Sequence, residues 1–383
     1  MNIVFRNNVS HIYINYWRKN KNDNTRDSYG KKFPWPKVED SRSWVIRDQF
    51  LARLEKIENY LRDRKKFNQG IYNNKDCLIC HKKDITTGSF NLNNIIWEDG
   101  LAHYVKIHEI KPEPQFIDKI FLFNLSKKKP STIHYKSKLY VKDDATYVKL
   151  TRNQILILDA LMKHGGYSKK YVDKHNENIF RYSEHAGLLD FGVTGLDKIL
   201  ISGNTTRIDR GDEEIYLPNN MPDTILYEYH WHSHPPEPPG SRISIPIVYE
   251  FPSVSDLFHF IDHHNDGIMQ GSLVITPEGL YNIRKYVFNA NKIRVDENKL
   301  LREMTDVMQK TQHKTVKKYG TKFTKEFFHE TIAQDLTALN EVNSALNKYN
   351  LHIDYWPREK DKKGRWIIET IYLPIYIISR KKS

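Results

Sequence analysis

A short segment near the middle of the chain carries two histidines at alternate positions, His232 and His234, followed at once by Pro235. In an extended strand alternate side chains point to the same face, so one strand directs both imidazoles toward a single point. Proline donates no backbone hydrogen bond and ends the strand there. The segment therefore predicts a sheet strand that ends in a paired-histidine metal site.

An aspartate downstream supplies a third ligand. Asp256 lies in Pro252-Ser253-Val254-Ser255-Asp256, directly before an apolar run that begins at Leu257. Proline followed by serine before such a run is typical of a helix N-terminus and places Asp256 in the first helical turn. Two imidazoles, one carboxylate and one open position are the composition of a catalytic zinc site. The alternative for Asp256 is a capping carboxylate, which the helix dipole also favours.

These residues resemble the JAMM metalloprotease family, also called the MPN+ or JAB domain. The family pattern is an upstream glutamate, then H-[S/T]-H-P, then S-x-x-D. His232-Ser233-His234-Pro235 matches the middle part, and Ser253-Val254-Ser255-Asp256 matches the last. Glu184 is the best match for the glutamate, with Gly187 and Leu189 at the family's spacing after it.

The chain departs from the family pattern in one interval. The stretch between His234 and Asp256 is about eleven residues longer than in the family, and loops accept such insertions at little entropic cost. We interpret the extra residues as a loop beside the site. If Asp256 is not the ligand, Asp262 is the next candidate.

The resemblance implies an α/β fold of the α+β type, in which helices flank a mixed β-sheet. It implies a Zn²⁺ ion held by His232, His234 and Asp256, with Glu184 as general base and Ser253 as a donor to the oxyanion. The implied reaction is amide hydrolysis on a protein substrate, in this family often the isopeptide bond of ubiquitin or a ubiquitin-like modifier. The alternative is an inactive scaffold, because many domains of this fold have lost the ligands and act as protein-interaction modules.

A second group of ligand-type residues lies toward the N-terminus. Cys77 and Cys80 form a C-x2-C pair, and His103 and His108 follow on an expected helix. This spacing is typical of a zinc site. The interval between Cys80 and His103 is longer than in a DNA-binding zinc finger, which favours a small module stabilised by zinc. The segment weakly resembles C-x2-C…HY-x3-H segments of giant-virus proteins, which implies no activity. The alternatives are buried free thiols and, because His81 follows Cys80, a c-type haem attachment for which no axial partner is specified.

The patterning divides the chain into five segments. Residues 1–38 are expected to be loosely ordered apart from an apolar run over 12–17 that can add a strand. The other four are a helical zinc-binding module over 39–125, a basic linker over 126–144, the JAMM/MPN-like domain over 145–292 and a helical and β-hairpin extension over 293–383. In the zinc module, helical spacing relates Phe50, Leu54, Ile57 and Leu61, with Asp40 or Ser43 as the cap.

Local signals predict the elements of the second half. Within the JAMM/MPN-like domain these are a strand over 147–150, a helix capped by Thr151, strands over 196–202 and 225–232, a helix over 257–263 and a hairpin over 271–283. Beyond residue 295 the pattern predicts helices over 300–308 and 323–346, then two closing strands over 351–356 and 366–378 joined by a charged loop.

The net charge of +13 invites a nucleic-acid partner. The basic residues are scattered apart from Lys127-Lys128-Lys129 and residues 360–365, so a solvated basic surface is the favoured interpretation and nucleic acid is disfavoured. No apolar run of about 18 residues predicts a membrane span. The N-terminus lacks the layout of a signal peptide, and two cysteines argue against a disulfide framework. We therefore expect a soluble, intracellular protein without a membrane partner.

Overall fold

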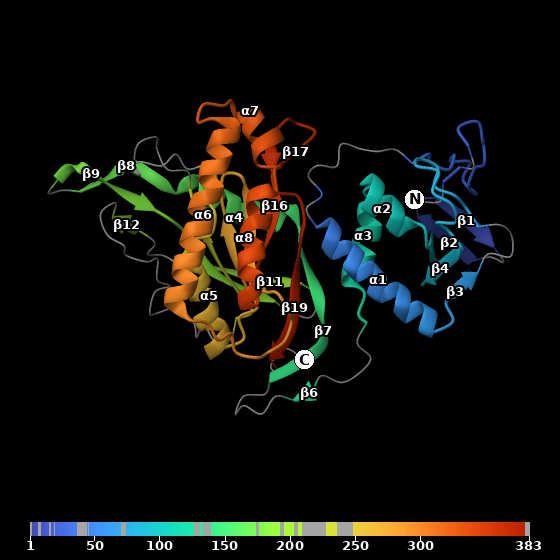
Figure 1. Cartoon of the computed structure of the whole chain (residues 1–383), viewed down its shortest axis with the longest axis horizontal. Helices are drawn as coiled ribbons and strands as arrows, with labels where there is room; N and C mark the ends of the chain where they lie inside the picture. The colour runs from blue at the N-terminus through green and yellow to red at the C-terminus, as the bar shows by residue number, and fades with distance from the viewer. Residues whose placement is uncertain are drawn as a thin grey trace. The chain divides into compact units, whose positions relative to one another are not determined.

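The computed structural model describes residues 2–6, 9–14, 17–18, 20–36, 44, 46–69, 74–125, 131–132, 139–173, 176–191, 195–202, 206–208, 227–235 and 248–379. The chain divides into two compact units, Met1–Leu125 and Ser126–Ser383 (Figure 1). Each unit combines helices with sheets, which confirms the mixed α+β class. Among the described residues, no helix is long and apolar enough to cross a membrane.

The first unit contains a five-stranded sheet of order β1-β2-β5-β4-β3. Its strands are β1 (Asn2–Arg6), β2 (Val9–Ile14), β3 (Phe67–Gln69), β4 (Gly88–Leu92) and β5 (Ile95–Glu98). Residues 1–38 were expected to be mostly loosely ordered, but they supply two strands of this sheet. The reason is a distant partner: β2 pairs in parallel with β5, and this buries Tyr13 and Ile14.

Three helices belong to the same unit: α1 (Arg47–Asp63), α2 (Leu101–His108) and α3 (Pro114–Leu122). The apolar stripe predicted for the first helix is confirmed, because Phe50, Leu54, Ile57 and Leu61 are all buried. The helix begins at Arg47, and the two predicted caps, Asp40 and Ser43, lie outside the described residues. α1 contacts both α2 and α3 as well as β4.

The second unit is built on a six-stranded sheet of order β11-β10-β13-β14-β15-β16. The strands are β10 (Ala186–Phe191), β11 (Leu196–Ile201), β13 (Tyr229–Ser233), β14 (Gly271–Ile275), β15 (Gly279–Lys285) and β16 (Leu351–Pro357). β13 runs parallel to β14, and the other neighbours pair antiparallel. The predicted hairpin is therefore confirmed as β14 and β15, and the histidine-bearing strand is central in the sheet.

Four longer helices pack within this unit: α4 (Arg152–His164), α5 (Val254–Asp266), α6 (Glu297–Tyr319) and α8 (Thr337–Leu346). Thr151 caps α4 through a capping box with Gln154, as the sequence predicts. α4 contacts β13 and β14, and α5 contacts β14 and β15. Figure 1 shows α6 and α8 side by side, with α8 against β16.

The C-terminal segment differs from its prediction in two respects. The helix expected over 323–346 is broken into α7 (Lys325–Phe327), a π-helical turn (Phe328–Ile332) and α8. The two closing strands do not form a hairpin with each other. β16 pairs with β15, whereas β19 (Ile371–Ser379) pairs with β7 (Leu139–Leu150) in a separate sheet with β6 (Ser131–Thr132).

The remaining strands form two small sheets. β8 (Gly166–Asp173), β9 (Asn176–Ser183) and β12 (Thr206–Ile208) make one sheet, and β17 (Glu359–Lys360) with β18 (Trp366–Ile367) makes the other. β9 ends just before Glu184, and β10 begins just after His185. The segment that carries the predicted general base thus joins a small sheet to the central one.

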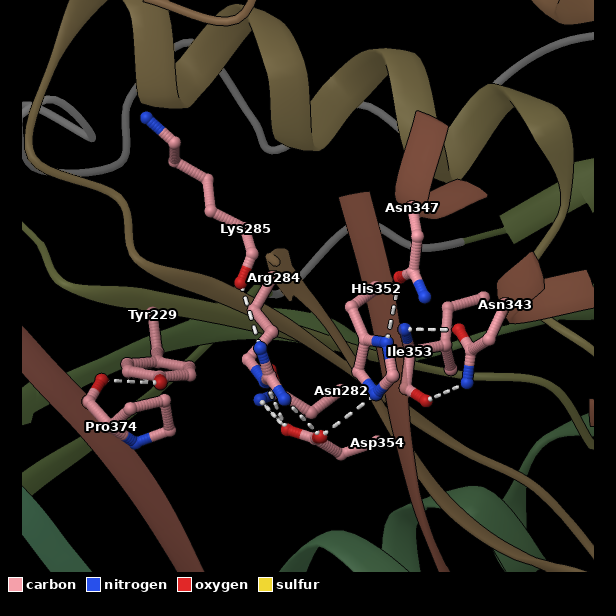
Figure 2. Close-up of polar contacts among 10 residues, drawn as sticks. All are labelled: Tyr229, Asn282, Arg284, Lys285, Asn343, Asn347, His352, Ile353, Asp354 and Pro374. Carbon is pink, nitrogen blue, oxygen red and sulfur yellow. Dashed lines mark hydrogen bonds and ion pairs between the residues drawn. The ribbon is translucent and has the colours of Figure 1, made fainter. Parts of the chain in front are cut away.

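A buried ion pair fixes β16 to β15 (Figure 2). Arg284 Nε donates to Asp354 Oδ2 at 2.6 Å, and Arg284 Nη2 donates to Oδ1 at 2.8 Å. Asn282 adds a third donor to this carboxylate at 3.2 Å. The carboxylate is thus held by two side chains of the neighbouring strand. Residues 351–357 are therefore part of the central sheet rather than of a separate extension.

Gly187 is the position in β10 where a side chain has no room. A β-carbon there would lie 1.8 Å from the carbonyl oxygen of Leu200 and 2.7 Å from Nε1 of Trp231, whose indole donates to that oxygen at 3.2 Å. Replacing Gly187 by alanine is expected to push β10 and β11 apart and lower the free energy of unfolding by roughly 1–3 kcal/mol. Chemical denaturation of the two proteins measures the difference. An unchanged midpoint would contradict this packing.

Candidate metal centres

Strand β13 holds the first pair of ligand-type side chains in place. All five of its residues are buried, between β10 on one side and β14 on the other. The backbone N–H of His234 donates to the carbonyl of Ile275 at 2.9 Å, which extends the pairing with β14 beyond the end of the strand. His232 and His234 therefore sit on an ordered backbone and, two residues apart, share one face of the sheet.

Helix α5 brings Asp256 to the same face. Ser253 is its N-cap: its hydroxyl accepts from the Asp256 N–H at 3.2 Å, and Asp256 Oδ2 accepts from the Ser253 N–H at 2.6 Å. The sequence allows a capping role for Asp256 as the alternative to metal binding. The structure combines cap and cluster in one residue, because Oδ2 caps the helix while Oδ1 lies 3.1 Å from His232 Nε2.

The three side chains converge as a metal site requires. The Nε2 atoms of His232 and His234 are 3.1 Å apart, and His234 Nε2 is 3.5 Å from Asp256 Oδ2. Ligands bound at ~2.0–2.1 Å to a tetrahedral zinc lie about 3.3–3.4 Å from one another. The donor set and its spacing thus fit a zinc ion. We call these three residues the histidine–aspartate cluster.

Electrostatics within this cluster favour a cation. Burial alone would lower the pKa of His232, but the Asp256 carboxylate outweighs burial and raises that pKa above its ordinary value. Burial likewise opposes ionisation of Asp256, yet the two imidazoles and the Ser253 N–H hold its pKa well below the usual range. Asp256 is therefore a carboxylate at neutral pH, in the form that binds metal.

Glu184 lies beside the cluster. Ala186 pairs with His232 across β10 and β13, so Glu184, two residues earlier, faces the same side of the sheet as His232. Its side chain is 3% exposed, and its carboxylate contributes to the raised pKa of His232. A buried carboxylate next to the ligands is the placement that a general base needs.

A backbone clamp that the sequence analysis missed holds Glu184 there. The Ser233 N–H donates to the carbonyl of His185 at 2.8 Å, and the His185 N–H donates to Ser233 Oγ at 2.9 Å. Ser233 lies between the two histidine ligands, so the clamp links the position of Glu184 to theirs. The signal available in the sequence was the serine between the histidines, whose side chain points to the opposite face.

The other predicted residues are also located. Ser253 is exposed at the start of α5. Its hydroxyl oxygen accepts the capping bond, so the O–H can still donate. His230, interpreted as a packing residue, is buried against Met269 and hydrogen-bonds Ser272. Asp262 lies on α5 outside the histidine–aspartate cluster.

The first unit holds the second group, which we call the cysteine–histidine cluster: Cys77, Cys80, His103 and His108. Cys77 Sγ lies 3.2 Å from His108 Nε2, and Cys80 Sγ lies 3.3 Å from His103 Nε2. Both histidines lie on α2, as the sequence predicts. Burial lowers the pKa of each, so both imidazoles are neutral at pH 7 and able to bind metal.

Zinc binding by the histidine–aspartate cluster is expected to weaken as pH falls. A histidine must lose its proton to bind metal. The Asp256 carboxylate raises the pKa of His232 above its ordinary value, so protons compete with zinc at a higher pH than at an ordinary histidine. Calorimetric titration at about pH 8, 7 and 6, in a Cys77→Ser/Cys80→Ser background, measures the trend. An affinity that does not change over this range would contradict the assignment.

The comparisons place the chain in a family. Fold and sites define a mixed α+β protein with two groups of potential metal ligands. The chain is similar to the uncharacterized protein R413 of Acanthamoeba polyphaga mimivirus: the two are 32% identical over 340 residues, 85% of this chain and 93% of the relative. The chain belongs to the same family as R413. No protein-family model matches the chain, and no solved structure matches it.

Proposed function

We propose that the second unit is a zinc-dependent hydrolase of amide bonds, acting on the isopeptide bond of ubiquitin or a ubiquitin-like modifier. One observation carries the proposal. The Nε2 atoms of His232 and His234 and the carboxylate oxygens of Asp256 lie 3.1–3.5 Å from one another, and the buried carboxylate of Glu184 lies beside them. The substrate class comes from the resemblance to JAMM metalloproteases. The similarity to the viral protein R413 is compatible with such an activity, but the name of R413 states no activity.

Each residue of the site has a chemical role in this proposal. His232, His234 and Asp256 would hold the metal, and a set of only three protein ligands is the composition of catalytic rather than structural zinc sites. When bound, zinc supplies a Lewis acid that polarises the scissile carbonyl and makes water acidic enough to attack near neutral pH. Glu184 takes the proton from the attacking water and later delivers it to the leaving amine.

Ser253 has two roles in this proposal. As N-cap of α5 it fixes the first turn, and with it Asp256. In this proposal its exposed hydroxyl donates to the oxygen that becomes negatively charged during attack. Replacing Ser253 by alanine is expected to lower the hydrolysis rate by about 10²-fold through loss of this donor and to weaken the cap. A Ser253→Gly protein, which removes the hydroxyl donor but is tolerated at an N-cap at a cost of only a few tenths of a kcal/mol, separates the two effects.

The test is cleavage of ubiquitin dimers of defined linkage by the zinc-loaded full chain, followed by gel and mass spectrometry. The proposal predicts mono-ubiquitin as product and loss of cleavage in Asp256→Ala. If zinc-loaded protein cleaves neither the dimers nor a ubiquitin-like conjugate, the isopeptidase proposal fails and the scaffold alternative takes its place. Cleavage that persists in Asp256→Ala would mean that another site is responsible.

A further inference from the structure

The cysteine–histidine cluster takes no part in the proposed hydrolysis, and its own geometry fits a metal. In a tetrahedral zinc site with bonds of ~2.3 Å to sulfur and ~2.0–2.1 Å to nitrogen, neighbouring sulfur and nitrogen ligands lie about 3.5 Å apart. The two observed sulfur–nitrogen distances are 3.2 and 3.3 Å. Two thiols and two imidazoles complete the coordination, so the cluster leaves no open position for a substrate.

The surroundings of Cys77 point to a ligand independently of those distances. Its sulfur accepts from the backbone N–H groups of Ile79 at 3.4 Å and Cys80 at 3.5 Å. The hydroxyl of Tyr104 donates to the same sulfur and accepts from the Leu78 N–H at 3.0 Å. Hydrogen-bond donors directed at one buried sulfur fix its orientation, as the partners around a metal ligand do.

The same geometry disfavours the alternatives. The two thiols form no disulfide, and each sulfur lies close to a histidine Nε2 of α2, at 3.2 Å for Cys77 and 3.3 Å for Cys80. A c-type haem would use His81 as its axial ligand, but His81 is exposed and lies outside the cluster. Thiols that only fill the core do not explain why two imidazoles and three hydrogen-bond donors converge on the cysteines.

We infer that the first unit holds a structural zinc ion in the cysteine–histidine cluster, with Tyr104 as the positioning residue of the Cys77 thiolate. The ion joins the turn at residues 77–80 to α2. The local apolar core is small: Cys77, Tyr104 and Ile110 are its buried members, and Trp17, Ile79 and Ile85 pack against them. Zinc binding therefore supplies much of the cohesion here, as it does in small metal-folded modules.

Cobalt titration of the metal-free full chain tests this inference. Cobalt bound to thiolates gives a near-ultraviolet charge-transfer band, whereas the histidine–aspartate cluster contains no sulfur and gives none. In Asp256→Ala, where the histidine–aspartate cluster no longer competes for cobalt, the expected result is a saturable band at about one cobalt per chain that zinc abolishes. The band should vanish in Cys77→Ser and persist in His81→Ala and Asp256→Ala. Failure here leaves the proposed hydrolase untouched, because the two sites give different signals.

Two further variants keep the test decisive if Cys77→Ser does not fold. His103→Cys adds a thiolate and should strengthen the band roughly in proportion to the number of sulfur ligands. Tyr104→Phe should keep the band but weaken metal affinity by about 10–100-fold, as loss of a partner to a ligand does. Absence of the band in wild type, an unchanged band in His103→Cys, or unchanged metal affinity in Tyr104→Phe would each overturn the corresponding assignment.

Discussion

Replacing Glu184 by glutamine is expected to lower the rate of amide hydrolysis by about 10²–10⁴-fold, the usual contribution of a general base. Glutamine keeps the size and the hydrogen-bonding capacity of the side chain but accepts no proton at neutral pH. The three residues of the histidine–aspartate cluster are unchanged in this variant, so zinc content should stay as in wild type. Steady-state cleavage of a fluorogenic isopeptide substrate, measured beside metal analysis, gives both quantities.

Asp190→Asn is the matched control for this experiment. Asp190 lies on β10 a few residues beyond Glu184 and outside the histidine–aspartate cluster. The same change from acid to amide there should leave the rate within a small factor of wild type. If Glu184→Gln hydrolyses as fast as wild type, Glu184 is not the general base. If it loses zinc instead, Glu184 acts on the metal site rather than on the proton.

Replacing Arg284 by alanine is expected to lower the free energy of unfolding by about 3–5 kcal/mol. The Arg284–Asp354 pair is deeply buried, with side-chain exposures of 8% and 2%, so the variant leaves the Asp354 carboxylate without its cation (Figure 2). Urea unfolding of the full chain, followed by circular dichroism and tryptophan fluorescence, measures the loss. Because β16 contributes Asp354, a large loss also shows that β16 is an essential part of the six-stranded sheet.

The exposed pair Lys310–Asp306 on α6 is the matched control, with side-chain exposures of 66% and 59%. Lys310→Ala should cost no more than about 0.5 kcal/mol, because water screens such pairs. The double variant Arg284→Met/Asp354→Leu should recover much of the lost stability, since no charge is then left buried. A loss below about 1 kcal/mol in Arg284→Ala would contradict the burial of this pair.

Local signals explain what the sequence could predict of the fold. The stripe from Phe50 to Leu61, the Thr151 cap and the hairpin of β14 and β15 each depend on residues close together in the chain, so periodicity and turn chemistry were sufficient. The pairing of β2 with β5, and of β16 and β19 with different strands, joins segments far apart in sequence. Propensity carries no information about such partners.

The candidate sites likewise contain residues that the sequence predicts and contacts that it does not predict. The two groups of ligand-type residues can be predicted from sequence spacing. Alternate side chains of a strand point to the same face, and side chains one turn apart on a helix lie on the same face. The Ser233–His185 clamp and the Tyr104 contact to Cys77 depend on the register between strands and on the packing of α2, which spacing does not reveal. Most of the insertion after His234 lies outside the described residues, so its interpretation as a loop stays a prediction.

Zinc content per chain tests the central claim most directly. Wild-type protein purified without added metal, and Asp256→Ala prepared alongside, are measured by mass spectrometry of the metal. Loss of one of three ligands should remove about one zinc ion per chain, so we predict about two ions in wild type and about one in the variant. Equal zinc content in the two proteins would contradict a metal site at His232, His234 and Asp256, and with it the proposed hydrolase.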